Sequence, residues 1–246
     1  MSGHAAHLQI MSWNLLAHEF TGYEAKNHRH DSGDKDKLEH VDQFAERCER
    51  ARRAILGRDA TVVLLQEVSF SFLNDTSHGG VYPPSASLDE LHRRYQVIPA
   101  FGDSGKGANE PGTAVLVRRG ITVADHFIVA GSRHATGGTS KSACAACVQL
   151  PDVRLWCVSI HTTWGGNQEA AGKRVQHLNL LHTTIAARLL PSDAVVVGGD
   201  FNCSDQDPQL ATISDCLAPL KRVELPGKTH THENGKCTVS SRRAHT

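Results

Sequence analysis

The chain has 246 residues, which is enough for one large domain with a substantial buried core. Its 26 lysines and arginines balance 26 acidic residues, so no overall positive field attracts nucleic acid and no acidic tract predicts a disordered tail. Residues 1–16 lack the apolar core of a signal peptide, and no apolar run is long enough to cross a bilayer. We therefore expect a single domain over residues 1–246, located in the cytoplasm or the nucleus.

Short β-like segments alternate with helical ones in the first part of the chain. Residues 8–14 predict a strand, and the polar residues 18–37, which are rich in Gly and Asp, predict a long surface loop. Apolar residues recur at helical spacing over 38–56, and Gly57 predicts the end of this helix. Residues 61–68, TVVLLQEV, are continuous and β-branched, which predicts a central strand covered on both faces.

Strands dominate the middle of the chain. Residues 87–95 predict a short helix, and the strands predicted after it cover residues 95–99, 112–118, 122–129, 142–150 and 154–161. A hairpin turn at residues 151–152 joins the last two. A helix over residues 168–190, closed by Pro191, and a strand over residues 194–198 complete the pattern. This order predicts two packed sheets with helices outside, and not a regularly wound parallel sheet.

Four of these strands end in polar residues of a kind that strand interiors avoid. The four ends are Trp13-Asn14, Gln66-Glu67, Ile160-His161 and Gly199-Asp200-Phe201-Asn202. On an extended backbone, Asp200 and Asn202 would share one face about 6.6–6.8 Å apart, while Phe201 would face the core. We therefore expect the four ends to converge on a common cleft.

An acid, an amide and a histidine gathered around a second acid suit the hydrolysis of phosphate esters. Glu67 and the amide oxygen of Asn14 are hard oxygen ligands, appropriate to Mg²⁺ or Mn²⁺ and poor for zinc alone. A second carboxylate can orient the attacking water, while amide and imidazole N–H groups donate to the charge that grows on the phosphoryl oxygens. The alternative is that each polar residue only caps the end of its strand by hydrogen bonding.

Five segments of the chain occur in an order typical of a known family. They are MSWNLLA (11–17), LLQEV (64–68), GTAVLVRR (112–119), VSIHTTW (158–164) and VGGDFNCSDQDP (197–208). On these segments, residues 8–208 resemble the endonuclease/exonuclease/phosphatase superfamily, which has the deoxyribonuclease I-like fold. The residues after Asn14 and around His161 look most like the deadenylase, nocturnin-like and angel-like branch.

The resemblance implies a fold and a metal site. The fold is a four-layer α/β sandwich, with two mixed β-sheets face to face and helices outside. Carried over by position, Asn14 and Glu67 would hold a divalent metal, Mg²⁺ or Mn²⁺. Gly112 and Thr113 resemble the loop that approaches the substrate in the family.

The resemblance also implies the catalytic residues. Asp200 would orient or activate the attacking water, Asn202 would steady the transition state, and His161 would bond the scissile phosphate. Arg174, on the helix after His161, is expected to be a structural partner and not a site residue. The implied function is a Mg²⁺-dependent phosphodiesterase, a nuclease acting on RNA. The alternative is a phosphomonoesterase of phosphoinositide or nucleotide substrates, because the same core could serve both.

The C-terminal part departs from the family pattern. Family members end in a strand that carries Asp-His, and residues 203–246 contain no such dipeptide. One interpretation is that the chain is incomplete and lacks the last β-hairpin, so that residues 238–240 only begin a strand and the second sheet has an open edge. Another is that His232 or His245 has taken over the catalytic role. A third is a non-catalytic or impaired protein that retains the metal ligands.

Overall fold

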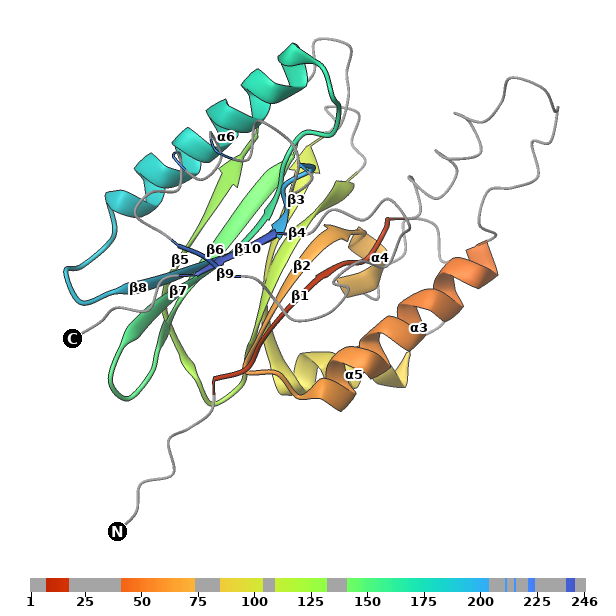
Figure 1. Cartoon of the computed structure of the whole chain (residues 1–246). Coiled ribbons are helices and arrows are strands. Elements are labelled where there is room, and N and C mark those ends of the chain that lie inside the picture. Colours follow the sequence, from red (N-terminus) through yellow and green to blue (C-terminus); the bar gives the residue numbers. More distant parts are fainter. Residues whose placement is uncertain are drawn as a thin grey trace, which may run out of the picture.

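Two β-sheets face each other, and helices cover their outer faces (Figure 1). This computed structural model describes residues 8–17, 41–73, 85–103, 109–131, 141–203, 211, 215, 221–223 and 238–241. The predicted loop over residues 18–37 and the candidate histidines His232 and His245 lie outside the described residues. Among the described residues, no helix is long and apolar enough to cross a membrane.

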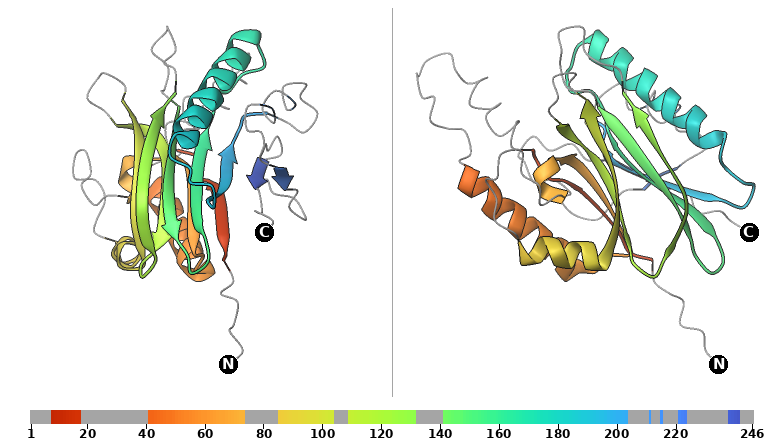
Figure 2. Two further views of the ribbon diagram at one scale, coloured as in Figure 1. Left: turned by 90° about the vertical axis from the view of Figure 1, so that its left-hand side faces the viewer. Right: turned by 180° about the vertical axis from the view of Figure 1, so that it is seen from behind.

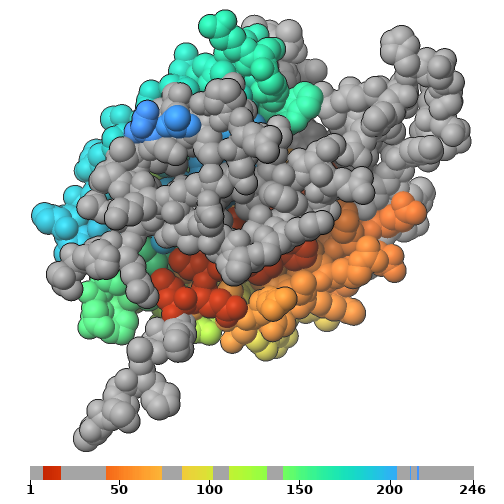
Figure 3. All heavy atoms as spheres, in the orientation of Figure 1, coloured from red at the N-terminus to blue at the C-terminus, as the bar shows by residue number. Residues whose placement is uncertain are grey.

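The first sheet has four strands in the order β1-β2-β4-β3. Their bounds are Ile10–Asn14 for β1, Val62–Val68 for β2, Tyr95–Asp103 for β3 and Asn109–Arg118 for β4. β1 runs parallel to β2, and β4 is antiparallel to both of its neighbours. In the space-filling view of Figure 3, the atoms of β1 (red) reach the surface beside those of α3 (orange, Val41–Arg58).

The second sheet has six strands in the order β5-β6-β7-β8-β10-β9. Their bounds are Thr122–Ala130 for β5, Ser142–Gln149 for β6, Arg154–His161 for β7, Ala194–Asp200 for β8, Lys221–Val223 for β9 and Thr238–Ser241 for β10. β7 and β8 are parallel and the other pairs are antiparallel, so both sheets are mixed, as predicted. Residues 238–241 form strand β10, which pairs with β8. The incomplete-chain interpretation had expected the second sheet to have an open edge.

Three apolar clusters separate the four layers of the sandwich. In β2, Val63 and Leu65 pack under α3 and α5 (Ala86–Arg94), while Val62 and Leu64 point toward the second sheet. Because successive side chains of a strand alternate between its faces, a continuous apolar run is what a strand covered on both faces requires. α6 (Gln168–Ala186) covers the outer face of the second sheet (Figure 2). The predicted four-layer α/β sandwich is therefore confirmed.

Strand β6 is built from small residues that lie between two layers. Its Ala143 and Ala145 contribute to the cluster under α6, and its Cys144 and Ala146 to the cluster between the sheets. The five described cysteines are free and buried. Burial raises the pKa of the Cys144 thiol to about 12, so this thiol stays protonated and behaves as a small apolar side chain.

Two predicted helix ends are wrong by a few residues, and local turn chemistry explains both. Helix α3 continues through Gly57 to Arg58, and Asp59 then adopts the left-handed conformation (φ 46°) usual for a residue just past a helix. Helix α6 ends at Ala186 and not at residue 190, because Asp193 organises a turn by accepting a hydrogen bond from the backbone N–H of Leu190 at 3.2 Å. The short helix α4 (Phe70–Leu73) was not predicted.

Candidate active site

The C-terminal ends of four strands, two from each sheet, meet on one side of the sandwich. In the parallel pair β1–β2, Asn14 lies opposite Gln66, next to Glu67. In the parallel pair β7–β8, His161 lies opposite Asp200. The predicted convergence is therefore observed, because hydrogen bonds join residues of the two sheets directly.

Asn14 joins the carboxylates of the two sheets. Its Nδ2 donates to Glu67 Oε1 at 3.1 Å and to Asp200 Oδ2 at 3.0 Å. Its Oδ1 accepts a hydrogen bond from the backbone N–H of Leu16 at 2.9 Å. In this orientation, which hydrogen bonding assigns, the amide holds two acidic groups together and turns its oxygen away from them. Its role as an oxygen ligand of a metal stays a prediction.

Glu67 occupies a β-bulge. Gln66 and Val68 pair with consecutive residues of β4, so Glu67 is the extra residue, and its φ of 52° is unusual for a residue other than glycine. Bulges re-aim side chains and are frequent beside active sites. The carboxylate accepts a hydrogen bond from the backbone N–H of Ala17 at 3.2 Å. Burial raises the pKa of Glu67, although Lys141, Asn14 and Ala17 oppose this shift.

His161 is 4% exposed and faces both carboxylates. Its Nε2 lies 3.5 Å from Glu67 Oε1 and 4.0 Å from Asp200 Oδ2. Burial holds the pKa of His161 well below its usual value, and the nearby Lys141 and His177 lower it further. The imidazole is therefore neutral at neutral pH and has one N–H donor and one acceptor nitrogen.

The carboxylates and the imidazole fit a divalent cation. One ligand atom from each of Glu67, His161 and Asp200 lies within 4.8 Å of the other two, which leaves a common position for one ion. Carboxylate oxygens suit Mg²⁺ and Mn²⁺, and an imidazole nitrogen is a better ligand for Mn²⁺ than for Mg²⁺. Of these three residues, sequence analysis predicted only Glu67 as a metal ligand. It assigned Asp200 and His161 to catalysis.

The backbone turns sharply after Asp200, so the predicted extended geometry is wrong. Asn202 has a φ of 50°, and its backbone N–H donates to Asp200 Oδ1 at 2.8 Å. This local hydrogen bond competes with continuation of the strand. The Asn202 side chain is 7% exposed, and its Nδ2 donates to the carbonyl of Thr162 at 2.8 Å. Phe201 packs in the core, as predicted.

Two glycines allow β8 to carry Asp200 into this position. A Cβ at Gly198 would lie 2.8 Å from Leu64 Cδ1 in the opposite sheet. A Cβ at Gly199 would lie 1.9 Å from the carbonyl oxygen of Ile160 in the adjacent strand. A side chain at Gly199 would collide with fixed backbone, so glycine is required there, whereas one at Gly198 would force the Leu64 side chain to shift.

Gly112 and Thr113 lie in β4 beside the bulge that holds Glu67. Thr113 is fully buried, and its Oγ1 lies 3.3 Å from the hydroxyl of Ser142. A Cβ at Gly112 would lie 1.9 Å from the carbonyl oxygen of Ala100. Both residues therefore pack behind Glu67, and their predicted approach to the substrate stays a prediction.

Arg174 is a structural residue, as expected. Its guanidinium is buried, and Nη1 donates to the carbonyls of Thr163 and Gly165 at 2.8 Å each. These bonds fix the segment after His161 on both sides of Trp164, which is 57% exposed. An exposed aromatic side chain therefore stands on a rigid backbone only three residues from the site.

Lys141 is a site residue that sequence reasoning missed. Its Nζ lies 3.2 Å from Nε2 and 3.4 Å from Nδ1 of His161. In the sequence it follows the polar residues Thr139 and Ser140, where a lysine is normally solvated. No signal in the local pattern distinguishes it from a surface lysine.

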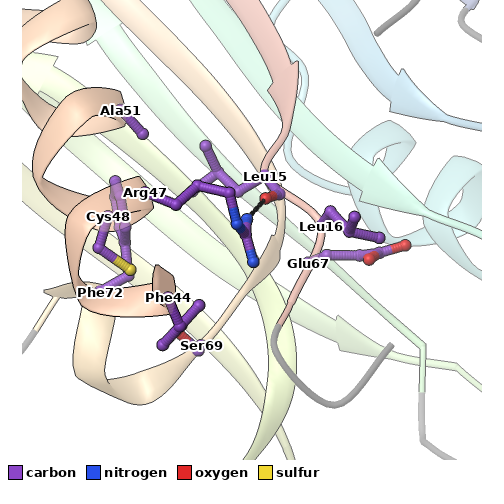
Figure 4. Close-up of a pocket in the computed structure, with 9 residues that line it drawn as sticks. All are labelled: Leu15, Leu16, Phe44, Arg47, Cys48, Ala51, Glu67, Ser69 and Phe72. Carbon is purple, nitrogen blue, oxygen red and sulfur yellow. Dashed lines mark hydrogen bonds between the residues drawn. The ribbon is translucent and has the colours of Figure 1, made fainter. Parts of the chain in front are cut away.

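A small pocket adjoins the site on the side of α3 (Figure 4). In this view Glu67 lies at the edge of the pocket, with its carboxylate directed away from α3. Arg47 Nη1 donates to the carbonyl of Leu15 at 2.5 Å and so connects the helix to the segment after β1. The pocket is lined by Leu15, Leu16, Phe44, Arg47, Cys48, Ala51, Glu67, Ser69 and Phe72.

The family of the chain follows from its sequence. Residues 11–235 match the model of the endonuclease/exonuclease/phosphatase family. The chain belongs to this family, whose members are phosphoric ester hydrolases. No curated protein matches the chain in sequence.

Solved structures of three other proteins have the same fold. The catalytic domain of human nocturnin, solved with bound sulfate, is 16% identical, has a TM-score of 0.64, and matches over 95% of this chain and 82% of its own. ANGEL2, described as a 2′,3′-cyclic phosphatase, is 18% identical with a TM-score of 0.62, over 85% of this chain and 57% of its own. TDP2 from Caenorhabditis elegans is 17% identical with a TM-score of 0.53, over 81% of this chain. The chain spans about half (49%) of the length of that TDP2.

Proposed function

We propose that this protein is a divalent-metal-dependent phosphodiesterase that hydrolyses RNA. The observation that carries the proposal is the cluster of Asn14, Glu67, His161 and Asp200 at the ends of four strands, in a chain of a phosphoesterase family. Bringing two carboxylates together at a nearly buried position lowers the stability of the fold unless a cation or a substrate offsets their charge. Such an arrangement is typical of a functional site.

The proposed reaction is an in-line attack of water on phosphorus. The Asp200 carboxylate orients the water and accepts a proton from it as the oxygen–phosphorus bond forms. The ester P–O bond breaks on the opposite side, and the leaving oxygen takes up a proton. The neutral imidazole of His161 donates its N–H to a phosphoryl oxygen, and Asn202 keeps Asp200 in place through its backbone N–H.

Glu67 and Asp200, with Asn14 as the predicted third ligand, would hold Mg²⁺ or Mn²⁺. When bound, the cation supplies positive charge to the phosphoryl oxygens and so favours attack by water. In its absence, Asn14 Nδ2 lies between the carboxylates and reduces their repulsion.

An RNA substrate is supported by Trp164. Base stacking on an aromatic side chain contributes about 1–3 kcal/mol per base and tolerates many sequences. Trp164 is mostly exposed, and Arg174 fixes the carbonyls on either side of it. The complex of ANGEL2 with adenosine-2′,3′-vanadate is an example of this fold with a nucleoside ligand.

A phosphomonoesterase acting on a nucleotide or a phosphoinositide is the second candidate. The neutral net charge and the aromatic content of 5% favour a compact substrate over a broad nucleic-acid groove. Comparing turnover of an RNA oligonucleotide, a dinucleotide with a 2′-phosphate and an inositol phosphate separates the two candidates. Metal binding in calorimetry without turnover of any of them would favour a third candidate, an impaired protein without the family's Asp-His.

The direct test is hydrolysis of a labelled oligoadenylate with Mg²⁺ and with EDTA, together with the variant Asp200→Ala. We expect EDTA to abolish hydrolysis and the variant to reduce it by about 10²- to 10⁴-fold. Asp152→Ala, on the exposed turn between β6 and β7, is the matched control and should keep full activity. Equal rates in all of these conditions would exclude the proposed function.

A further inference from the structure

The fold brings Lys141 to the site through the second sheet. Lys141 immediately precedes β6, and β6 is antiparallel to β7 with Ala143 opposite Ile160. The beginning of β6 therefore lies beside the end of β7, where His161 is. The Lys141 carbonyl accepts a hydrogen bond from the backbone N–H of Gly131 at 2.5 Å, and a Cβ at Gly131 would lie only 2.4 Å from that oxygen. The backbone of Lys141 is thus held in place by close packing.

The side chain of Lys141 places a positive charge within the cluster. Its Nζ is within 3.4 Å of both ring nitrogens of His161, and Nε2 of that ring is 3.5 Å from Glu67 Oε1. Among the described residues, two arginine side chains near the site donate to backbone carbonyls. Arg174 donates to those of Thr163 and Gly165, and Arg47 donates to that of Leu15.

A phosphate that approaches two carboxylates is repelled by them, and fixed cations reduce this repulsion. An oxygen that accepts a hydrogen bond from His161 would lie next to the Lys141 ammonium, because the two groups are in contact. We propose that Lys141 binds a non-bridging oxygen of the scissile phosphate and is a further substrate-binding residue. This inference rests on the proposed function, since it assigns the phosphate to the same cluster.

The test measures phosphate binding separately from turnover. The affinity for inorganic phosphate in the presence of Mg²⁺ is measured by calorimetry for the wild type, Lys141→Met, Lys141→Arg and Lys173→Met. A charge-assisted hydrogen bond corresponds to about 10- to 100-fold in affinity, so we expect Lys141→Met to bind phosphate that much more weakly. Lys141→Arg keeps the charge and should recover most of the affinity. Lys173→Met removes a lysine that pairs with Glu169 on α6 and should bind as the wild type does.

The same variants are assayed for hydrolysis of a diester, and their folding is checked by circular dichroism. If Lys141→Met does not fold, Lys141→Gln replaces it. Wild-type phosphate affinity in a folded neutral variant would overturn the proposal even if turnover falls, because Lys141 would then act only by supporting His161. A wild-type protein that binds no phosphate would overturn it as well. If phosphate binds through Lys141 but no ester is hydrolysed, the proposed function fails, and only the assignment of Lys141 as a phosphate-binding residue stands.

Discussion

At the scale of single residues, the site combines groups that are poorly suited to the interior with groups that hold them there. Glu67 is 12% exposed in its side chain, has a left-handed backbone and faces a second carboxylate. Its raised pKa reflects the cost of burying its charge. Natural proteins keep such unfavourable features mainly where function needs them.

We therefore expect Glu67→Gln to separate activity from stability. The amide removes a buried charge, so hydrolysis should fall by at least about 10²-fold while the thermal midpoint in EDTA is unchanged or higher at pH 7. The sign follows from linkage: a raised folded pKa favours the protonated carboxyl, and this stabilisation is lost as pH rises through that value. Thermal unfolding and diester hydrolysis of the two proteins check this. A lower midpoint for the variant would show that the charge stabilises the fold.

His177 should make stability depend on pH. Its side chain is 3% exposed, and burial lowers its pKa to about 4. The unfolded chain binds this proton below about pH 6.5, so stability falls as pH decreases from 6.5 toward 4. We expect a loss of about 2.5 kcal/mol between pH 7.5 and 4.5 from this group.

Urea unfolding of wild type and His177→Leu at the two pH values measures the effect of this histidine. The variant should lose about 2.5 kcal/mol less than the wild type between them. Equal losses would mean that His177 is protonated in the folded protein without cost.

Individual residues were predictable where burial decides their place. Phe201 follows from its position between two polar residues at a strand end. The turn at Asn202 did not follow, because a hydrogen bond to Asp200 Oδ1 decides its backbone conformation. Lys141 could not be found either, since its contact with His161 depends on the pairing of β6 with β7.

At the scale of elements, the strands were found because apolar residues continue along them, whereas the ends of helices α3 and α6 were missed. Polar turn residues set these helix ends: Asp59 pairs with Arg94 and Arg118 at the end of α3, and Asp193 sets the turn after α6. Periodicity reports neither contact, because the partners of Asp59 are distant in sequence and Asp193 bonds within a local turn.

Side chains at the two glycines of strand β8 should destabilise the fold to different extents. Gly198→Ala places a methyl group 2.8 Å from Leu64 Cδ1, so we expect a loss of about 1–3 kcal/mol in the free energy of unfolding. Gly199→Ala should cost more, since its Cβ meets backbone at 1.9 Å. Gly57→Ala, in helix α3 with nothing within 4 Å, is the control and should be neutral or stabilising by up to about 1 kcal/mol. Denaturant unfolding of the three variants checks the order, which would be contradicted if Gly198→Ala were as stable as Gly57→Ala.

At the scale of the whole molecule, the four-layer arrangement was predictable from the order of elements and from the family resemblance. The sequence could not show that Asn14 donates to the carboxylates, because the orientation of an amide depends on the partners that surround it. It indicated that residues 238–240 begin a strand, but not that this strand pairs with β8.

Binding of a divalent cation should stabilise the whole fold, because its proposed ligands Glu67 and Asp200 come from different sheets. At a concentration 100 times the dissociation constant, a ligand that binds only the folded state adds about 2.7 kcal/mol. We expect Mg²⁺ or Mn²⁺ to raise the thermal midpoint of the wild type relative to EDTA, and to raise that of Asp200→Asn much less. Equal shifts in the two proteins would place the cation elsewhere.

Asn14 contacts Glu67 in its own sheet and Asp200 in the other, so the apolar layer between the sheets also sets the distance across the proposed catalytic centre. Residues such as Cys144 and Ala146, which touch no substrate, act as spacers for that distance. Enlarging them would widen the gap between the halves of the centre before the protein unfolds. Selection for activity should therefore restrict side-chain volume at these interior positions more strictly than selection for folding alone.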